Sequence, residues 1–350
     1  MDIEKPTLRI HRLVFRMQAE EQRSVSRYGP PIQCISHGYL IRVGESAKEI
    51  VSATIRSSNA RLRSKVTGEH HSVALRSIDA LGSDRFHVLH EPGLLQRRFE
   101  AQFIRAVGQL KYEDRYNARP SNAHRREIVK SVEPQQDRLI VSLGGSTDLA
   151  ELASKILPVA DADGFLDSGI PGLRYSSSAQ GITLFLPDHD AEIILSRVSA
   201  KGWARAVAEA ESSPDSHLTF LSRYETVTAL ELQAISPGES SWEDSRSDAE
   251  SAFLRRIMAV DVLNPSLISV WMALPEEFHV AIWVDEHDEE REENLIKLMT
   301  NERFLPHLAL VERQGHWLDF ELASGRRVVI RIQLAPTSPA AARLRDSFYP

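Results

Sequence analysis

The sequence predicts an α+β protein with two ferredoxin-like α/β sandwich units and a basic α/β N-terminal region. Strand-like apolar runs alternate with amphipathic helical runs over residues 137–235, and a similar alternation returns over 266–334. A polar linker and a helix are expected between these units at 236–265. The basic region occupies 1–135, and a flexible tail with three prolines is expected at 335–350.

The basic N-terminal region is expected to contain strands and one long helix. An apolar run with arginines on one side predicts a strand over 7–16, and a second strand is expected at 85–90. The long helix is expected over about 93–116, because its apolar residues fall on one stripe. These stripe residues are Leu95, Phe99, Phe103, Ala106, Val107 and Leu110.

The first ferredoxin-like unit is expected to begin with a strand that ends at Gly144 and Gly145. Asp148 can cap the helix that follows, with Glu151 three residues later as in a capping box. Apolar residues at helical spacing continue this helix as far as Ile156.

The second half of this unit is expected to add a buried strand, a helix and a last strand. The strand is predicted at 182–186, where Pro187 ends it. The helix is predicted to carry Ile193, Ile194, Val198 and Trp203. The last strand or strands are expected at 218–221 and in the apolar-rich run 227–235.

The second unit shows its strands by alternation. Apolar residues at every second position from Phe278 to Val284 predict one strand, after an apolar run at 267–274. Acidic residues at 285–293 open a helix, where they complement its dipole. A strand at 308–311 and a β-hairpin complete the unit. The hairpin pairs Leu318, Phe320 and Leu322 with Val328, Ile330 and Ile332.

Composition places the chain among cytoplasmic proteins. With 350 residues and 42% hydrophobic content, one to three globular domains with a sizeable core are expected. No apolar run approaches the roughly 18 residues of a membrane span, so no membrane partner is expected. The N-terminal residues lack the apolar core of a signal peptide, and the single cysteine, Cys34, fits a reducing compartment.

Charge is spread unevenly along the chain. Residues 1–140 have a balance of +8 and residues 141–350 a balance of −15. Such asymmetry points to a basic half that binds a partner, with nucleic acid as one candidate. Two halves that attract each other, or differing solvated faces, would produce it as well, and +8 over 140 residues is modest beside nucleic-acid-binding modules. The candidate phosphate-binding residues are Arg97, Arg98, Arg105, Arg125 and Arg126.

One strand-end cluster could hold a metal ion. Asp188, His189 and Asp190 follow the strand predicted at 182–186, and carboxylates with imidazole are common metal ligands. This cluster is the basis of a metal-dependent hydrolase as an alternative. The sequence contains no phosphate-binding loop or dinucleotide glycine pattern, so no cofactor is expected.

A short motif at 165–170, Phe-Leu-Asp-Ser-Gly-Ile, is similar to the Asp motif of subtilisin-like serine proteases. Catalysis by such a triad also needs a His and a nucleophilic Ser in their own motifs. His37-Gly38 continues as Tyr39-Leu40, and no nucleophile motif is present. An active protease is therefore not expected.

Three other segments carry a further resemblance. They are residues 27–31 (Arg-Tyr-Gly-Pro-Pro) with His37-Gly38-x-x-Ile41 after them, the strand ending at Phe185-Leu186-Pro187 with a helix to Trp203, and residues 221–231 with their Leu-Glu pair. Together they resemble the prodomain-like N-terminal region of large bacterial subtilisin-like serine proteases. The catalytic domain of that family has no counterpart in these 350 residues.

The resemblance implies a role in protease regulation. Ferredoxin-like prodomains of that family pack their sheet on the protease and lay a C-terminal tail in its substrate cleft, as chaperone and inhibitor. The tail at 335–350 would correspond to that segment. We therefore expect a non-catalytic, cytoplasmic regulatory protein that binds a protein partner, with a serine protease as the candidate. A nucleic-acid-binding component of a larger assembly, acting through the basic region, is the first alternative.

Overall fold

The computed structural model describes residues 53–82, 86–113, 125–161, 165–187, 189–212, 219–235, 241–274, 277–284, 288–322 and 329–336. The chain divides into two compact units, Met1–Ala53 and Thr54–Pro350, and the features below belong to the second. Helices and mixed sheets both occur, so the α+β class is confirmed. The strand expected at 7–16, Cys34 and the tail beyond Pro336 lie outside the described residues.

The N-terminal part of this unit is mainly helical. Helical residues 53–67 precede α3 (His71–Ala80), and α4 (Leu94–Val107) follows. The helix predicted over 93–116 is shorter than expected because Gly108, with a φ of 65°, ends it. The chain then enters strand β1 (Gln109–Glu113).

The strand predicted at 85–90 is wrong for its described residues, 86–90, which form no strand. The carbonyl groups of Val88 and His90 instead accept hydrogen bonds from the buried side chains of Arg63 and Arg255, at 2.9 Å each. Arginine side chains thus satisfy backbone groups that a neighbouring strand would otherwise pair.

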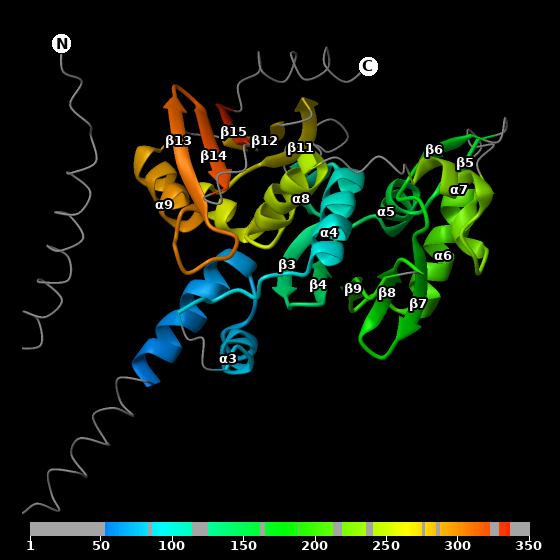
Figure 1. Cartoon of the computed structure of the whole chain (residues 1–350), viewed down its shortest axis with the longest axis horizontal. Helices are drawn as coiled ribbons and strands as arrows, with labels where there is room; N and C mark the ends of the chain where they lie inside the picture. The colour runs from blue at the N-terminus through cyan, green and yellow to red at the C-terminus, as the bar shows by residue number, and fades with distance from the viewer. Residues whose placement is uncertain are drawn as a thin grey trace, which may run out of the picture. The chain divides into compact units, whose positions relative to one another are not determined.

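A seven-stranded mixed sheet contains the second predicted unit (Figure 1). Its order is β13 (Leu308–Gln314), β14 (Trp317–Leu322), β15 (Val329–Pro336), β12 (Glu277–Val284), β11 (Leu267–Leu274), β1 and β2 (Arg125–Glu127). The strand predicted from Phe278 to Val284 and the antiparallel pairing of β14 with β15 are both confirmed. Helix α9 (Glu289–Met299) follows β12, and its first turn is acidic as expected.

A five-stranded sheet contains the first predicted unit. Its order is β3 (Val129–Pro134), β4 (Arg138–Leu143), β9 (Glu192–Ser196), β8 (Gly181–Phe185) and β7 (Arg174–Ser178). Helix α5 (Leu149–Ile156) has the predicted Asp148 cap. Helix α6 (Ala200–Glu211) packs beside α5.

Two predictions for the first unit are wrong. Ile193 and Ile194 lie in strand β9 and not in a helix, because β9 pairs with β4 on one side and β8 on the other. The apolar-rich run at 227–235 forms helix α7 (Ala229–Ala234) and not a strand. Thr228 and Glu231 make a reciprocal capping box there, and that box favours a helix start.

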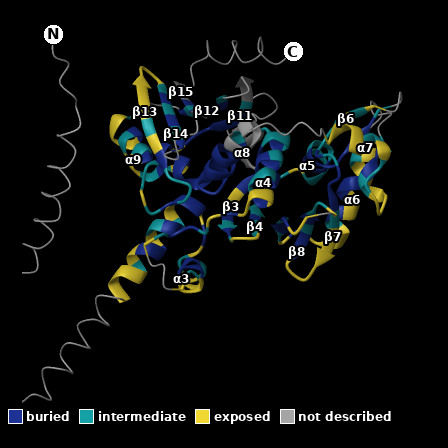
Figure 2. Cartoon of the chain, viewed as in Figure 1, coloured by how far each residue is buried: buried dark blue, intermediate teal, exposed yellow. Residues whose placement is uncertain are grey.

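The remaining elements lie outside these two sheets. They are a three-stranded sheet in the order β10 (Thr219–Phe220), β5 (Val159–Ala160) and β6 (Leu166–Ser168), the 3-10 helix η4 (Leu221–Arg223), helix α8 (Ser241–Leu254) and the 3-10 helix η5 (Ile257–Leu263). Helices α4 and α8 pack against each other (Figure 1). Buried residues, dark blue in Figure 2, lie along the strands and on the helix faces that cover them.

The two larger sheets repeat one topology. Each has an antiparallel strand pair, then a helix, then three strands, and the last strand is parallel to the second of the pair. The successions are β3, β4, α5, β7, β8, β9 and β11, β12, α9, β13, β14, β15. The short strands β5 and β6 are inserted after α5. An aspartate, Asp148 or Asp288, caps the helix in each copy. In this arrangement β7 and β13 occupy equivalent sheet edges.

Candidate functional site

The predicted phosphate-binding arginines of α4 face acidic residues of α8. Arg97 Nη1 lies 2.8 Å from Asp248 Oδ1, and Arg105 Nε lies 3.3 Å from Glu250 Oε1. Arg98 also has an interaction partner. The positive charges of Arg97 and Arg105 are therefore paired with carboxylates of this same chain. Arg125 and Arg126 lie on β2, and their side chains are outside the described residues.

The metal cluster predicted at 188–190 is only partly described. His189 and Asp190 are both exposed in the connection between β8 and β9, and Asp188 lies outside the described residues. The His189 N–H donates to the carbonyl of Leu186 at 3.0 Å. Among the described residues, no three His, Cys, Asp or Glu side chains come together as a metal site. The metal site stays a prediction.

The motif similar to the protease Asp motif has a structural explanation. Asp167 is exposed on the short strand β6. Gly169, with a φ of 86°, lies so close to the preceding connection that an added Cβ would lie 2.0 Å from the carbonyl oxygen of Leu157. Only glycine fits this close approach between chain segments.

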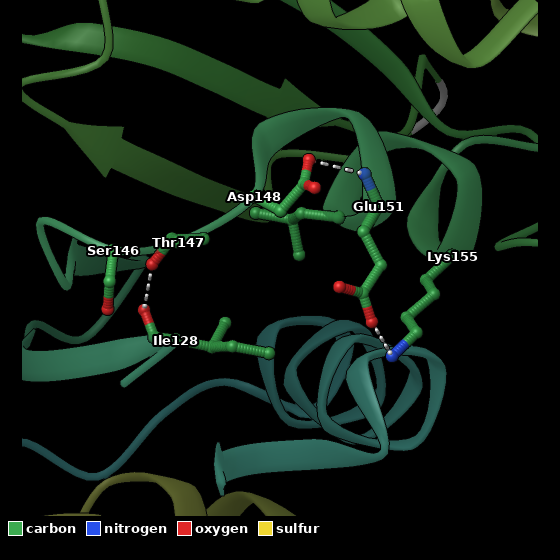
Figure 3. A pocket seen from close by; sticks show the side chains of 7 residues that line it. Ile128, Ser146, Thr147, Asp148, Glu151 and Lys155 are labelled. Carbon is green, nitrogen blue, oxygen red and sulfur yellow. Dashed lines mark hydrogen bonds and ion pairs between the residues drawn. The ribbon is translucent and has the colours of Figure 1, made fainter. Parts of the chain in front are cut away.

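A small pocket lies at the start of α5 (Figure 3). Its volume of about 10 Å³ accommodates roughly one water molecule. Asp148 accepts hydrogen bonds from the N–H groups of Ala150 and Glu151, and Lys155 Nζ lies 2.9 Å from Glu151 Oε1. These polar groups cap and brace the helix, so we assign the pocket a structural role.

The strongest concentration of recognition chemistry lies on one face of the seven-stranded sheet. Successive side chains of a strand point to opposite faces. Phe278 of β12 points to the helix side, where its ring meets Phe253 of α8 edge-on at 5.7 Å. The opposite face carries the set that we call the tryptophan–arginine face. Its members are Trp271, Glu277, His279, Trp317, Asp319 and Arg331.

Ion pairs connect three strands across this face. Arg331 of β15 forms a bidentate pair with Asp319 of β14, with Nε–Oδ1 at 2.9 Å and Nη2–Oδ2 at 2.8 Å. Arg331 Nη1 also donates to Glu277 Oε2 at 3.3 Å, and that oxygen lies 2.8 Å from His279 Nε2. The hydrogen bonds and the charge of Asp319 raise the pKa of Arg331 above its ordinary value.

Aromatic rings form a row over the same strands. The His279 ring lies 5.6 Å from the Trp271 ring and 6.1 Å from the Trp317 ring. The Arg331 guanidinium lies 5.7 Å from the Trp317 ring centroid, within range of a cation–π interaction. The Arg331 side chain keeps 31% of its surface exposed and Glu277 keeps 21%, whereas His279, at the centre of the row, is buried.

This arrangement is suited to recognition. Both carboxylates are held by Arg331, and none of the six residues that define this face is a Ser, Cys or Lys. Tryptophan and arginine are the residues most enriched at energetically dominant positions of protein interfaces. We had not predicted this face from the sequence. Its signal was the polar and aromatic residues alternating with the core residues that we did use, such as His279 between Phe278 and Val280.

The chain matches no known protein-family model, and no curated protein or solved structure is detectably similar to it. In the part of the chain that the structure describes, no helix is both long enough and apolar enough to cross a membrane.

Proposed function

We propose that this chain is a non-catalytic regulatory protein that binds a protein partner through the tryptophan–arginine face. The observation that carries the proposal is the row of Trp271, His279 and Trp317 with Arg331 stacked on Trp317. Cross-strand ion pairs hold Arg331 in place before binding, which lowers the conformational entropy that binding costs.

The partner class follows from the resemblance to protease prodomains. We propose that each repeated sheet is a variant of the ferredoxin-like unit. In that unit the last strand of the chain lies beside the first central strand. Here the strand that precedes the central strand, β3 before β4 or β11 before β12, takes that position. A sheet with helices on one face and a recognition row on the other suits packing of the sheet on a protease surface. A cytoplasmic subtilisin-like serine protease is therefore the partner that we propose.

Capture from the native host tests this proposal. Tagged wild type, a Trp271→Ala/Trp317→Ala variant and a Phe165→Ala variant would be compared at low and high salt. Phe165 is a matched control because it is an aromatic residue, 66% exposed, that lies just before β6 and away from the seven-stranded sheet. We expect a protein that survives high salt, is retained by Phe165→Ala and is lost from the double variant.

Two outcomes would contradict the proposal. A protein captured equally by the wild type and the double variant would place the interface elsewhere. Nucleic acid recovered at low salt only would favour the basic region, because phosphate contacts weaken steeply as salt rises. If a protease is captured, its inhibition by the purified chain can be assayed directly.

A further inference from the structure

Strand β7 ends the five-stranded sheet and has a hydrogen-bonded neighbour on one side only, β8. Two residues, Ala179 and Gln180, join the two strands, and Ser178 pairs with Gly181. In a two-residue hairpin the pair next to the turn exchanges backbone hydrogen bonds, and bonded and non-bonded pairs then alternate. Arg174, Ser176 and Ser178 therefore direct their N–H and C=O groups towards β8.

The alternate residues of β7, Tyr175 and Ser177, direct their backbone N–H and C=O groups away from the sheet. No described residue bonds to these groups. Ser176, Ser177 and Ser178 are exposed, and the end of the hairpin is yellow in Figure 2. Tyr175 anchors the strand, because its ring packs edge-on against Trp203 at 5.9 Å. The strand is thus held in place with a row of unpaired backbone groups at its edge.

The other edges of the two larger sheets carry the features that prevent edge-to-edge pairing. The equivalent edge of the repeat, β13, has a bulge between Leu310 and Glu312 and carries Arg313, which pairs with Glu292 at 2.7 Å. Strand β3 has a bulge, an exposed Lys130 and a terminal proline. Strand β2 consists of Arg-Arg-Glu. In contrast, β7 has no bulge or proline.

The one charged residue of β7, Arg174, is already paired within the chain. Arg174 is buried and donates to both carboxylate oxygens of Glu231, at 2.9 and 3.0 Å. It also donates to the carbonyl groups of Tyr224 and Thr226 at 2.6 Å each. A charged strand from another protein would therefore find no complementary free charge along β7. A second copy of β7, whose single charge is likewise paired with Glu231, would meet no repulsion.

We propose that β7 pairs with β7 of a second copy of this chain, antiparallel and across a two-fold axis at Ser176. This register places Tyr175 opposite Ser177 of the second copy, so that their outward N–H and C=O groups bond reciprocally. Ser176 faces its own counterpart, and Arg174 faces Ser178. The two five-stranded sheets would become one continuous sheet. The tryptophan–arginine face lies in the other sheet, so this proposal is independent of the proposed function.

Sedimentation of the full chain over roughly 1–200 µM tests the pairing. A contact of one short strand is at the small end of specific interfaces, so we expect a dimer with a Kd on the order of 1–100 µM. Ser177→Pro removes an outward N–H and leaves the bonds to β8 intact, so it should be folded and monomeric over this range. Ser177→Thr keeps the N–H and is the matched control, which should dimerise like the wild type.

A charge swap at the two-fold axis tests the register. Ser176→Lys or Ser176→Glu alone places like charges opposite each other and should weaken dimerisation at least tenfold. An equimolar mixture of these two variants should dimerise again. A wild type that stays monomeric at 200 µM would overturn the proposal, as would a dimer that survives Ser177→Pro or a mixture without rescue. Thermal unfolding confirms that each variant is folded.

Discussion

Glu100 of α4 and Arg255, which follows α8, form an ion pair with both side chains fully buried. Arg255 Nη2 lies 2.6 Å from Glu100 Oε1, and Arg255 Nε lies 2.8 Å from Oε2. The same carboxylate accepts from Ser251 at 2.6 Å and from Gln96 at 2.8 Å. Arg255 also donates to the carbonyl groups of His90 and Gln135. The pair therefore links α4 and the end of α8 to the segment before α4 and to the β3–β4 turn.

Removing one member of this pair should destabilise the protein strongly. Glu100→Leu or Arg255→Met leaves a buried charge without its partner, and we expect each to lower the free energy of unfolding by about 3–5 kcal/mol. The double variant should be more stable than either single variant, because no charge remains unpaired. Urea denaturation measures all four proteins. Single variants within about 1 kcal/mol of the wild type would contradict the role assigned to the pair.

His90 should make stability fall in mild acid. Burial and, to a smaller extent, the charges of Arg63 and Arg255 lower the pKa of His90 from 6.5 to about 4, while Asp137 opposes the shift. In the unfolded chain, His90 binds a proton below about pH 6.5. In the folded protein, His90 binds that proton only near pH 4. Stability is therefore complete above pH 6.5 and is lost as the pH falls towards 4.

His90→Gln should remove this part of the pH dependence. We expect the wild type to lose on the order of 1–2 kcal/mol between pH 7 and 4.5 from this residue, because the half-buried ring is partly screened. Urea denaturation at each of these two pH values measures the loss. His189→Gln, a substitution at an exposed histidine, is the control. An identical pH slope for wild type and His90→Gln would rule out His90 as its source.

Arg256 is a buried cation without a counter-ion among the described residues. It donates to the carbonyl of Pro306 and lies over the Phe304 ring at 5.3 Å, but no described residue accepts a hydrogen bond from its Nε or Nη1. Burial lowers its pKa to about 9. An apolar side chain of similar length would avoid the desolvation that this charge requires.

Arg256→Met should therefore be neutral or stabilising, by up to about 2 kcal/mol. The matched control is Arg63→Met, since Arg63 is equally buried but pairs with Glu69 at 2.8 Å. That control should lose about 3–5 kcal/mol. Chemical denaturation of both variants measures the difference. If Arg256→Met lost as much as Arg63→Met, a partner for Arg256 would have to exist.

Local signals predicted the helices and strands whose own residues decide their structure. Asp148 and Glu151 marked the start of α5, and strict alternation marked the strand from Phe278 to Val284. Ile193 and Ile194 also suited a helical stripe, and only pairing with two distant strands makes them a strand. The capping box of α7 was readable, but the apolar run beside it led to the wrong prediction.

The candidate site could not be found by such local signals. Trp271, His279, Trp317 and Arg331 come from four strands, and the parallel pairing of β12 with β15 places His279 beside Arg331. Cross-strand register is set by the whole sheet and not by any one segment. The two sheets repeat one topology, but their equivalent edge strands, β7 and β13, differ because only β13 has a bulge. This difference also becomes visible only when the strands are assembled into sheets.

A calorimetric titration would show whether the tryptophan–arginine face binds a protein partner. The partner captured from the host would be titrated, at high salt, against purified wild type, Trp317→Ala and Phe165→Ala. We predict that Trp317→Ala raises the Kd at least tenfold, a loss of about 1.4 kcal/mol or more, and that Phe165→Ala leaves it unchanged. An unchanged Kd for a folded Trp317→Ala variant would contradict the claim.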